Sequence, residues 1–233
     1  MLAGPILSVW AHPDDESYLA AGLMAAAADA GSRVVCVTAT AGELGTPDPA
    51  AWPPDRLGRL RRWETTAAMA ILGVHEHRFL GLPDGGLAKI DDTHGTGIVE
   101  ALIEELAPAT ILTFASHGMT FHPDHMAVSR WVTDAWRATG RPARLLQAVP
   151  DAAHFAEFAA EYERWGIYLG DERPDPVPVA EQAVHLRLEG CALDRKLAAL
   201  HAMASQTRPA VALMGEELYA AEVAVEAFIE VHT

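Results

Sequence analysis

The stretch PILSVWAHPDDESYLAAGLMAAAADAG, residues 5–31, decides the fold of this chain. It begins with a short apolar run, residues 5–10, that is typical of a buried β-strand. The run stops at a His-Pro step, and the alanine-rich residues 17–30 then favour a helix that Gly31 terminates. Strand, loop and helix in this order predict the first unit of an α/β fold.

The same alternation returns along the rest of the chain. Four further apolar runs are typical of strands buried on both faces of a parallel sheet; they lie at residues 33–40, 77–82, 110–116 and 143–149. Helical patterns stand between them, at residues 55–73, 97–107 and 125–140. The sequence therefore predicts an α/β fold with a doubly wound, mostly parallel sheet flanked by helices. Prolines interrupt the pattern at residues 170–182.

Composition limits the kinds of protein that this chain can be. A length of 233 residues with 50% hydrophobic content suits one core, so we expect a single domain over residues 1–233. The formal net charge of −15 disfavours a nucleic acid as partner. Cys36 and Cys191 stand far apart in apolar surroundings, which predicts two reduced core thiols. With no signal peptide and no apolar run long enough for a membrane span, we expect a cytoplasmic location.

Two loops carry most of the chemically reactive side chains. AHPDDE follows the first predicted strand, and HGMTFHPDH follows the fourth. If the strand order is the common 3-2-1-4-5, these strands are neighbours at the point where the chain reverses direction. Ligands bind in the crevice at that point, so we expect both loops to open into it.

The two loops supply a candidate metal site. His12 and Asp15 come from the first loop, and His125 can approach from the second. Nitrogen and oxygen ligands without a thiolate suit a divalent metal such as Zn²⁺, and a set of three leaves an open position for water. We therefore predict a catalytic metal site, with zinc or another divalent cation, rather than a closed structural one.

The neighbours of these ligands have candidate catalytic roles. Asp14, between two proposed ligands, could act as general base toward a water at the open position. His122 precedes His125 by three residues, and we expect Asp124 to hold its tautomer and favour the imidazolium form, which could stabilise an oxyanion or protonate a leaving amine. Glu16 begins the helix, so we expect it to support the site rather than bind the metal.

The paired motifs AHPDDE and HPDH resemble those of the LmbE/PIG-L family of metal-dependent de-N-acetylases. The segments RLRRWETTAAMAILGV, LGLPDGGL and DRKLAALHAMASQ also look like that family, whereas the segment from about Gly166 to Gln182 does not. The resemblance implies a Rossmann-like fold, bound Zn²⁺ and removal of an acetyl group from an N-acetylglucosamine-containing small molecule. It also implies that His12, Asp15 and His125 bind the metal, that Asp14 is the base and that His122, with Asp124 behind it, supplies the electrostatic or acid role.

The resemblance also brings two substrate-binding candidates and one departure. Arg61 and Asp84 match positions that look toward the sugar, although a structural salt bridge is the competing interpretation. Several sugar deacetylases have Tyr and Gly before the HPDH histidine, where this chain has Thr120 and Phe121. The usual electrophile is therefore missing or replaced, and Phe121 narrows a place where glycine would leave room.

Two other functions fit the same residues. One is a non-catalytic, metal-dependent protein that binds a sugar or metabolite, although Asp14 argues against it. The other is a metal-dependent hydrolase of another amide or of an ester, since the same activated water would serve. In each case we expect a small-molecule ligand, no nucleic acid and no membrane span, and exposed apolar helix faces are compatible with a homo-oligomer.

Overall fold

Short strands buried on both faces form the centre of the molecule. The structure is a computed structural model, which describes residue 2 and residues 4–232. Three adjacent strands of the sheet are buried at every position, which explains their continuous apolar sequences. The five parallel strands are β1 (Ile6–Trp10), β2 (Val34–Thr38), β3 (Glu76–Phe79), β4 (Thr110–Phe114) and β5 (Arg144–Ala148).

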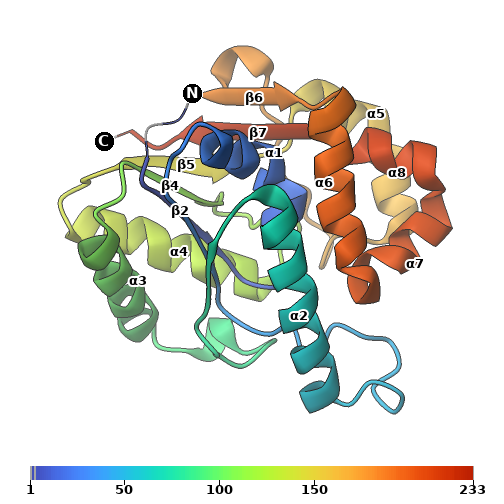
Figure 1. Cartoon of the computed structure of the whole chain (residues 1–233), viewed down its shortest axis with the longest axis horizontal. Helices are drawn as coiled ribbons and strands as arrows, with labels where there is room; N and C mark the ends of the chain where they lie inside the picture. Colours follow the sequence, from blue (N-terminus) through green and yellow to red (C-terminus); the bar gives the residue numbers. More distant parts are fainter. Residues whose placement is uncertain (1, 3, 233) are drawn as a thin grey trace.

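The strands form one mixed sheet in the order β3-β2-β1-β4-β5-β7-β6 (Figure 1). The predicted fold class and the 3-2-1-4-5 order of the parallel strands are confirmed. Two antiparallel strands that we did not predict, β6 (Val184–Arg187) and β7 (Val225–Glu230), extend the sheet beyond β5. β6 has only four residues, and it follows the proline-rich residues that obscured its pattern.

Helices cover both faces of the sheet. From β1 the chain moves along the sheet in one direction to β2 and β3, through α1 (Asp15–Asp29) and α2 (Pro54–Leu72). From β4 it moves in the opposite direction to β5, through α4 (Pro123–Ala138). Right-handed crossovers in opposite directions put helices on opposite faces. Accordingly α1 and α2 pack with α6 (Gly190–Ala202), whereas α4 packs with α3 (Asp92–Leu106), as Figure 1 shows.

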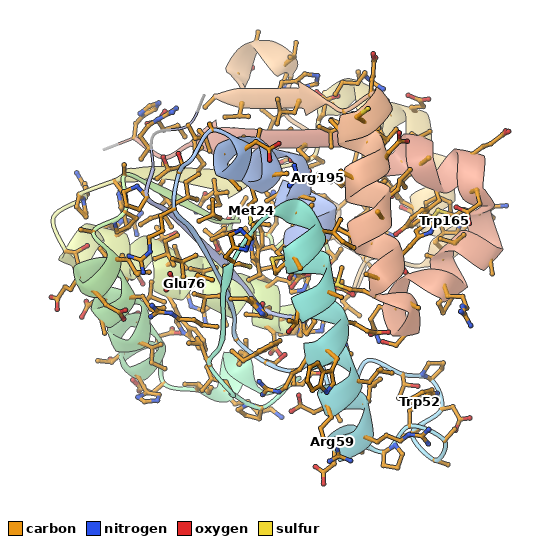
Figure 2. The ribbon with its side chains drawn as sticks, in the orientation of Figure 1. Met24, Trp52, Arg59, Glu76, Trp165 and Arg195 are labelled. Atoms are coloured by element: carbon orange, nitrogen blue, oxygen red, sulfur yellow. The ribbon has the colours of Figure 1, made fainter. Side chains whose placement is uncertain are left out.

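The last third of the chain forms a helical group beside this sandwich. It contains α5 (Ala152–Trp165), which we did not predict, together with α7 (Ala204–Met214) and α8 (Glu216–Glu222). Trp165, at the end of α5, lies within this group in Figure 2. Two short 3₁₀ turns, η1 (Leu87–Lys89) and η2 (Val179–Glu181), complete the elements of the described residues.

A buried ion pair fixes helix α1 against the C-terminal part of the chain. Lys196 Nζ lies 2.8 Å from Glu226 Oε1, and both side chains are fully buried. Lys196 also donates to the Tyr18 carbonyl, and the Glu226 carboxylate accepts from the backbone N–H groups of Gly22 and Leu23. The pair therefore holds α6, β7 and the middle of α1 together.

The two cysteines are free but differ in exposure. Cys36 is buried in β2, as expected, whereas Cys191 is exposed at the start of α6. The prediction of two core thiols is therefore wrong for Cys191, because an apolar neighbourhood in sequence does not fix which side of a helix a residue takes. In the part of the chain that the structure describes, no helix combines the length and apolar character needed to cross a membrane.

Candidate active site

The two reactive loops meet at the carboxyl ends of β1 and β4, where the chain reverses direction, as predicted. His12 follows β1 closely, and α1 then begins at Asp15. On the other loop, α4 begins at Pro123, with His122 as the residue that caps the helix. His122 Nδ1 accepts from the Asp124 backbone N–H at 3.2 Å. Both helix N-termini therefore face the same crevice.

The predicted metal ligands converge in this crevice. His12 Nδ1 lies 3.0 Å from His125 Nε2. Asp15 lies close to both rings, with Oδ2 at 3.6 Å from His12 Nδ1 and Oδ1 at 3.3 Å from His125 Nε2. His125 Nδ1 and the Gly118 carbonyl are 2.9 Å apart. Because a carbonyl can only accept, Nδ1 carries the proton and the lone pair of Nε2 points at His12.

Two carboxylates stand on the other side of the His12 ring. His12 Nε2 lies 3.1 Å from Asp84 Oδ1 and 3.4 Å from Asp124 Oδ2. Burial lowers the pKa of His12, but hydrogen bonds to Asp124 and Asp84 outweigh it and raise that pKa to about 10. Positive charge is thus favoured at His12. A proton on His12 Nδ1 would lie between His12 and His125, at the place where a metal ion would be held. The ring nitrogens of these two histidines therefore fit a metal ion as ligands.

His122 is the third imidazole of the cluster. Its ring centroid lies 4.7 Å from that of His12 and 4.9 Å from that of His125. Ligand atoms of these three histidines lie within 4.8 Å of one another, and so do those of His12, Asp84 and Asp124. Burial, followed by the charges of His12 and His125, lowers the pKa of His122 to about 4. Its neutral form, rather than the imidazolium that we expected, is therefore favoured.

The Asp124 carboxylate has a different partner from the one expected. It accepts from the backbone N–H groups of Gly85 and Leu87 at 2.8 and 2.9 Å, and it lies against His12. Only the backbone N–H of Asp124 reaches His122. The difference arises because Asp124 lies in the first turn of α4. Its backbone N–H faces the capping residue His122, whereas the Asp124 side chain points across the crevice to the loop after β3. Asp124 orients His12 and not His122.

Asp14, our candidate for the general base, follows His12 and Pro13 in the first loop. Its side chain is 21% exposed, next to the predicted ligands His12 and Asp15 in sequence. Burial raises the pKa of Asp14 to about 7, although the charge of Arg61 opposes the shift. A base with a pKa near the working pH is effective in proton transfer. Asp14 also has a φ of 112°, a strained conformation of the kind that gathers at active sites.

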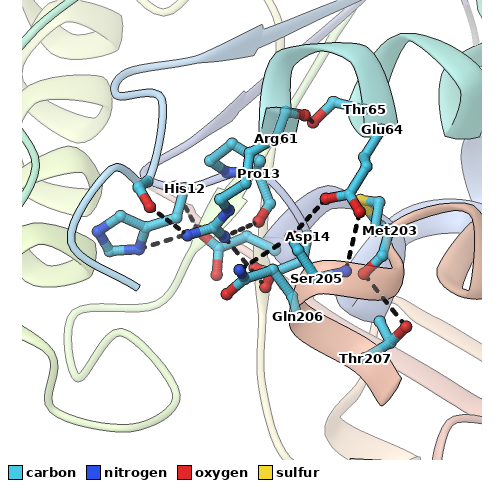
Figure 3. Close-up of polar contacts among 12 residues, drawn as sticks. His12, Pro13, Asp14, Arg61, Glu64, Thr65, Met203, Ser205, Gln206 and Thr207 are labelled. Carbon is cyan, nitrogen blue, oxygen red and sulfur yellow. Dashed lines mark hydrogen bonds and ion pairs between the residues drawn. The ribbon is translucent and has the colours of Figure 1, made fainter. Parts of the chain in front are cut away.

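Arg61 supports Asp14 instead of facing a substrate. It is only 3% exposed. Its guanidinium donates to the carbonyl of Pro13, to that of Gly42 at 2.7 Å, and to Asp14 Oδ2 at 3.3 Å (Figure 3). A Cβ at Gly42 would lie 2.1 Å from Arg61 Nη1, so only glycine permits this approach. Of our two interpretations of Arg61, substrate binding and a structural salt bridge, the structure agrees with the salt bridge.

The loops after β2 and β3 complete this side of the site. Asp84 Oδ2 accepts from the Leu44 backbone N–H at 2.8 Å, and Glu43 Oε1 accepts from the Asp84 backbone N–H at 3.0 Å. The second oxygen of Glu43 is buried without a hydrogen-bond partner. We did not predict Glu43, although an acidic residue soon after a buried strand, at the same edge as His12, was a usable signal.

Glu16 has the supporting place expected of it. It is fully buried, and its carboxylate accepts from the Asp14 backbone N–H at 3.3 Å and from the Ser17 hydroxyl at 3.1 Å. Burial raises the pKa of Glu16 to about 8, and the charges of Asp14 and Asp15 add to the effect. Glu16 thus holds the start of α1 in place.

The loop between β4 and His122 has an unusual backbone. Gly118, Met119 and Phe121 have φ values of 60°, 64° and 59°. A Cβ at Gly118 would lie 2.5 Å from the Cβ of His125, so the loop can pass the His125 side chain only with glycine there. Phe121 takes a left-handed conformation that glycine adopts more easily. The Phe at this position therefore adds strain as well as bulk.

A family model described as PIG-L: GlcNAc-PI de-N-acetylase matches residues 7–136, a range that contains all of the clustered side chains. The chain belongs to this family. A PIG-L relative from Acidothermus cellulolyticus, a 1D-myo-inositol 2-acetamido-2-deoxy-alpha-D-glucopyranoside deacetylase, is 35% identical over 232 residues, which cover 86% of this chain and 79% of that protein. Across the relatives of this description, the matches span 42% to 80% of their lengths.

Solved structures share the PIG-L fold at low sequence identity. An N,N'-diacetylchitobiose deacetylase from Pyrococcus horikoshii is 18% identical with a TM-score of 0.63, and the match covers 97% of this chain and 83% of that one. A 4-carboxy-2-hydroxymuconate hydratase from Pseudomonas putida has the same identity and TM-score, covering 98% and 96%. The fold therefore carries more than one reaction, and the site must decide which one this chain performs.

Proposed function

We propose that this chain is a zinc-dependent hydrolase that removes the N-acetyl group from an N-acetylglucosamine-containing small molecule or a related amide. The observation that carries the proposal is the convergence of His12, Asp15 and His125 beside Asp14, a carboxylate with a pKa near 7. The named activity of the Acidothermus relative supports the substrate class. We propose that residues 1–233 make a single domain of this kind.

His12, Asp15 and His125 would hold the metal ion. Their two imidazoles and one carboxylate are the ligand types of catalytic zinc sites, and other divalent ions accept the same set. When bound, the cation supplies a Lewis acid that polarises the amide carbonyl and makes water easier to deprotonate. Asp84 and Asp124 then act through His12, because carboxylates at Nε2 fix which ring nitrogen is free to bind the metal.

Asp14 and His122 move and stabilise charge during hydrolysis. Asp14 accepts a proton from the attacking water, whose oxygen forms a bond to the carbonyl carbon. The C–N bond then breaks, and the proton passes to the leaving nitrogen, which gives a free amine and acetate. His122 has its Nδ1 occupied as an acceptor, so its Nε2 carries the proton in the neutral form and can donate to the developing oxyanion.

The remaining predictions extend this proposal. Arg61 positions Asp14, and Asp84 orients His12, so both would act on substrate through another residue. We propose a cytoplasmic location, which the two unpaired cysteines support. The partner would be a small molecule, since an acidic chain is unsuited to nucleic acid.

Metal content of purified variants, measured together with turnover, tests these roles. We expect Asp14→Asn to keep its metal and to lose activity on the order of 10² to 10⁴-fold, the usual contribution of a general base. His12→Ala should lose metal and activity together, and His122→Ala should lower kcat with its metal retained. Asp29→Asn, on the exposed end of α1, is the control. Wild-type kcat in Asp14→Asn would exclude Asp14 as the base.

A further inference from the structure

A cavity of about 170 Å³ lies apart from the metal cluster and has no part in the mechanism above. Its wall comes mainly from α1, α5, the segment after α5, the end of α8 and the start of β7, and none of the clustered side chains lines it. Ile167, on the lining, is exposed, so a small molecule can enter at that edge. A dry cavity of about 150 Å³ holds benzene, and this one therefore suits a ligand of about six non-hydrogen atoms.

Four aromatic side chains line the cavity from three parts of the chain. They are Tyr18 of α1, Phe155 and Tyr162 of α5, and Tyr168 of the segment after α5. The ring centroids of Phe155 and Tyr162 lie 5.9 Å apart, and those of Tyr162 and Tyr168 lie 6.3 Å apart. The faces of aromatic rings attract cations, and rings grouped around a cavity are a known way to bind an organic ammonium ion. The lining therefore favours a cation as ligand.

The Glu222 carboxylate lies among these rings without a cationic partner. In the part of the chain that the structure describes it forms no ion pair, and the Tyr162 hydroxyl donates to it over a long 3.3 Å. Burial raises the pKa of three tyrosines on the lining, and the Glu222 charge adds to each shift; they are Tyr18, Tyr162 and Tyr168. The carboxylate is therefore close to phenol groups from three sides of the cavity, where a bound cation would be its missing partner.

The other two carboxylates of the lining already have partners. Asp151 accepts from the backbone N–H of His154 at 2.9 Å and from a side-chain amide at 2.8 Å. Glu226 forms the buried ion pair with Lys196, whose charge lowers the pKa of Glu222 without contacting it. Burial lowers the pKa of His154 and favours its neutral form, and the described lining contains no Lys or Arg. Glu222 is thus the charge that a ligand can complement.

We propose that this cavity is a second ligand site, which binds a small organic ammonium ion with its positive charge against Glu222 and the surrounding rings. Carbon groups on the nitrogen would pack against the apolar part of the lining, which includes Leu19, Val149 and Ile167. A metal ion is a poorer occupant, because Ca²⁺ and Mg²⁺ take about six oxygen ligands and the lining offers one unpaired carboxylate. The site shares no residue with the metal cluster, so it is independent of the proposed hydrolysis.

Calorimetric titration with choline and with 3,3-dimethylbutan-1-ol tests the site, because the two probes have nearly the same shape and differ in charge. We expect choline to bind the purified chain at least about tenfold more tightly than the alcohol. The titration is made at physiological ionic strength, which screens the general attraction of an acidic protein for cations. Equal affinities for the two probes, or no binding of choline at millimolar concentration, would overturn the proposal.

Variants show whether choline occupies this cavity. Glu222→Gln should weaken choline binding at least about tenfold and leave the alcohol unaffected, because it removes the charge and keeps an acceptor for Tyr162. Glu217→Gln, on the exposed side of α8 and outside the cavity, is the matched control and should bind choline as wild type does. His12→Ala should also bind choline normally, since the metal cluster takes no part.

A second cavity variant keeps the test open if Glu222→Gln fails to fold. Phe155→Leu removes one ring but keeps an apolar side chain on the lining, so it should weaken choline binding more than binding of the alcohol. Choline binding that is unchanged in Glu222→Gln, or lost in His12→Ala, would place the cation elsewhere on this acidic chain and overturn the proposal.

Discussion

Among the residues of the site, Asp14 has the most strained backbone conformation, and contacts from Arg61 stabilise it. A non-glycine residue at φ 112° costs on the order of 1 to 3 kcal/mol, which the surrounding contacts must offset. Arg61 supplies three of them, to the Pro13 and Gly42 carbonyls and to the Asp14 carboxylate. The planar guanidinium reaches all three acceptors at once, and a lysine ammonium cannot reproduce that geometry.

Arg61→Lys should therefore lower kcat with little change in KM or metal content. A displaced general base can cost on the order of 100-fold, and we expect a loss of that size. Arg62→Lys is the matched control, because Arg62 is the next residue on α2 and lies over the Phe79 ring, away from Asp14. A raised KM with unchanged kcat would instead return Arg61 to the substrate-binding role that the family resemblance suggested.

The convergence of His12, Asp15 and His125 was predictable from the sequence, because their motifs follow buried strands and parallel strands bring their carboxyl ends together. The contacts of Asp124 and Asp84 were not readable. Both carboxylates turn to His12, a choice that depends on the path of the loop after β3 and on backbone donors such as Gly85. Residue spacing within one loop carries no information about such contacts.

At the scale of elements, the repeating strand and helix pattern predicted the parallel core, whereas α5, β6 and β7 escaped it. The strands of the core are buried on both faces and have strong apolar signals. β6 alternates partly buried and exposed residues over only four positions, so its pattern is too short to recognise. One of these missed elements, β7, carries Glu226, which anchors α1.

The Lys196–Glu226 pair should be the strongest single polar contact that holds α1 in place. Lys196→Met leaves the Glu226 carboxylate buried without its cation, which typically costs about 3–5 kcal/mol. Urea unfolding should show this loss, and adding Glu226→Leu should restore part of it. Arg137→Met is the control, because Arg137 and its partner Asp134 are both exposed and exposed pairs contribute about 1 kcal/mol at most. Equal stability of Lys196→Met and wild type would show that the pair does not anchor the helix.

For the whole molecule, Glu222 should make stability depend on pH. Its pKa is about 6 in the folded protein, above the usual 4.5, because burial favours the neutral carboxyl. A raised pKa contributes stability that is complete below pH 4.5 and is lost as pH rises through 6. The shift corresponds to about 2 kcal/mol, and partial exposure makes this an upper value.

Glu222→Gln removes this titration and keeps an acceptor for the Tyr162 hydroxyl. The variant should gain up to about 2 kcal/mol relative to wild type as pH rises from 4.5 to 7, measured as the difference between their unfolding free energies at each pH. Glu217→Gln, on the exposed side of α8, is the control. A constant difference between Glu222→Gln and wild type over this range would mean that Glu222 titrates normally.

Acylamide hydrolysis that depends on the metal is the central claim for the molecule as a whole, and carboxylate release measures it directly. Purified protein is incubated with N-acetylglucosamine conjugates as isolated, after chelation, and after Zn²⁺ is restored. We predict that acetate is released, that chelation stops the release, that zinc restores it, and that Asp14→Asn lowers it on the order of 10² to 10⁴-fold. Release that survives chelation, or zinc-loaded protein that hydrolyses none of these amides, would contradict the assignment.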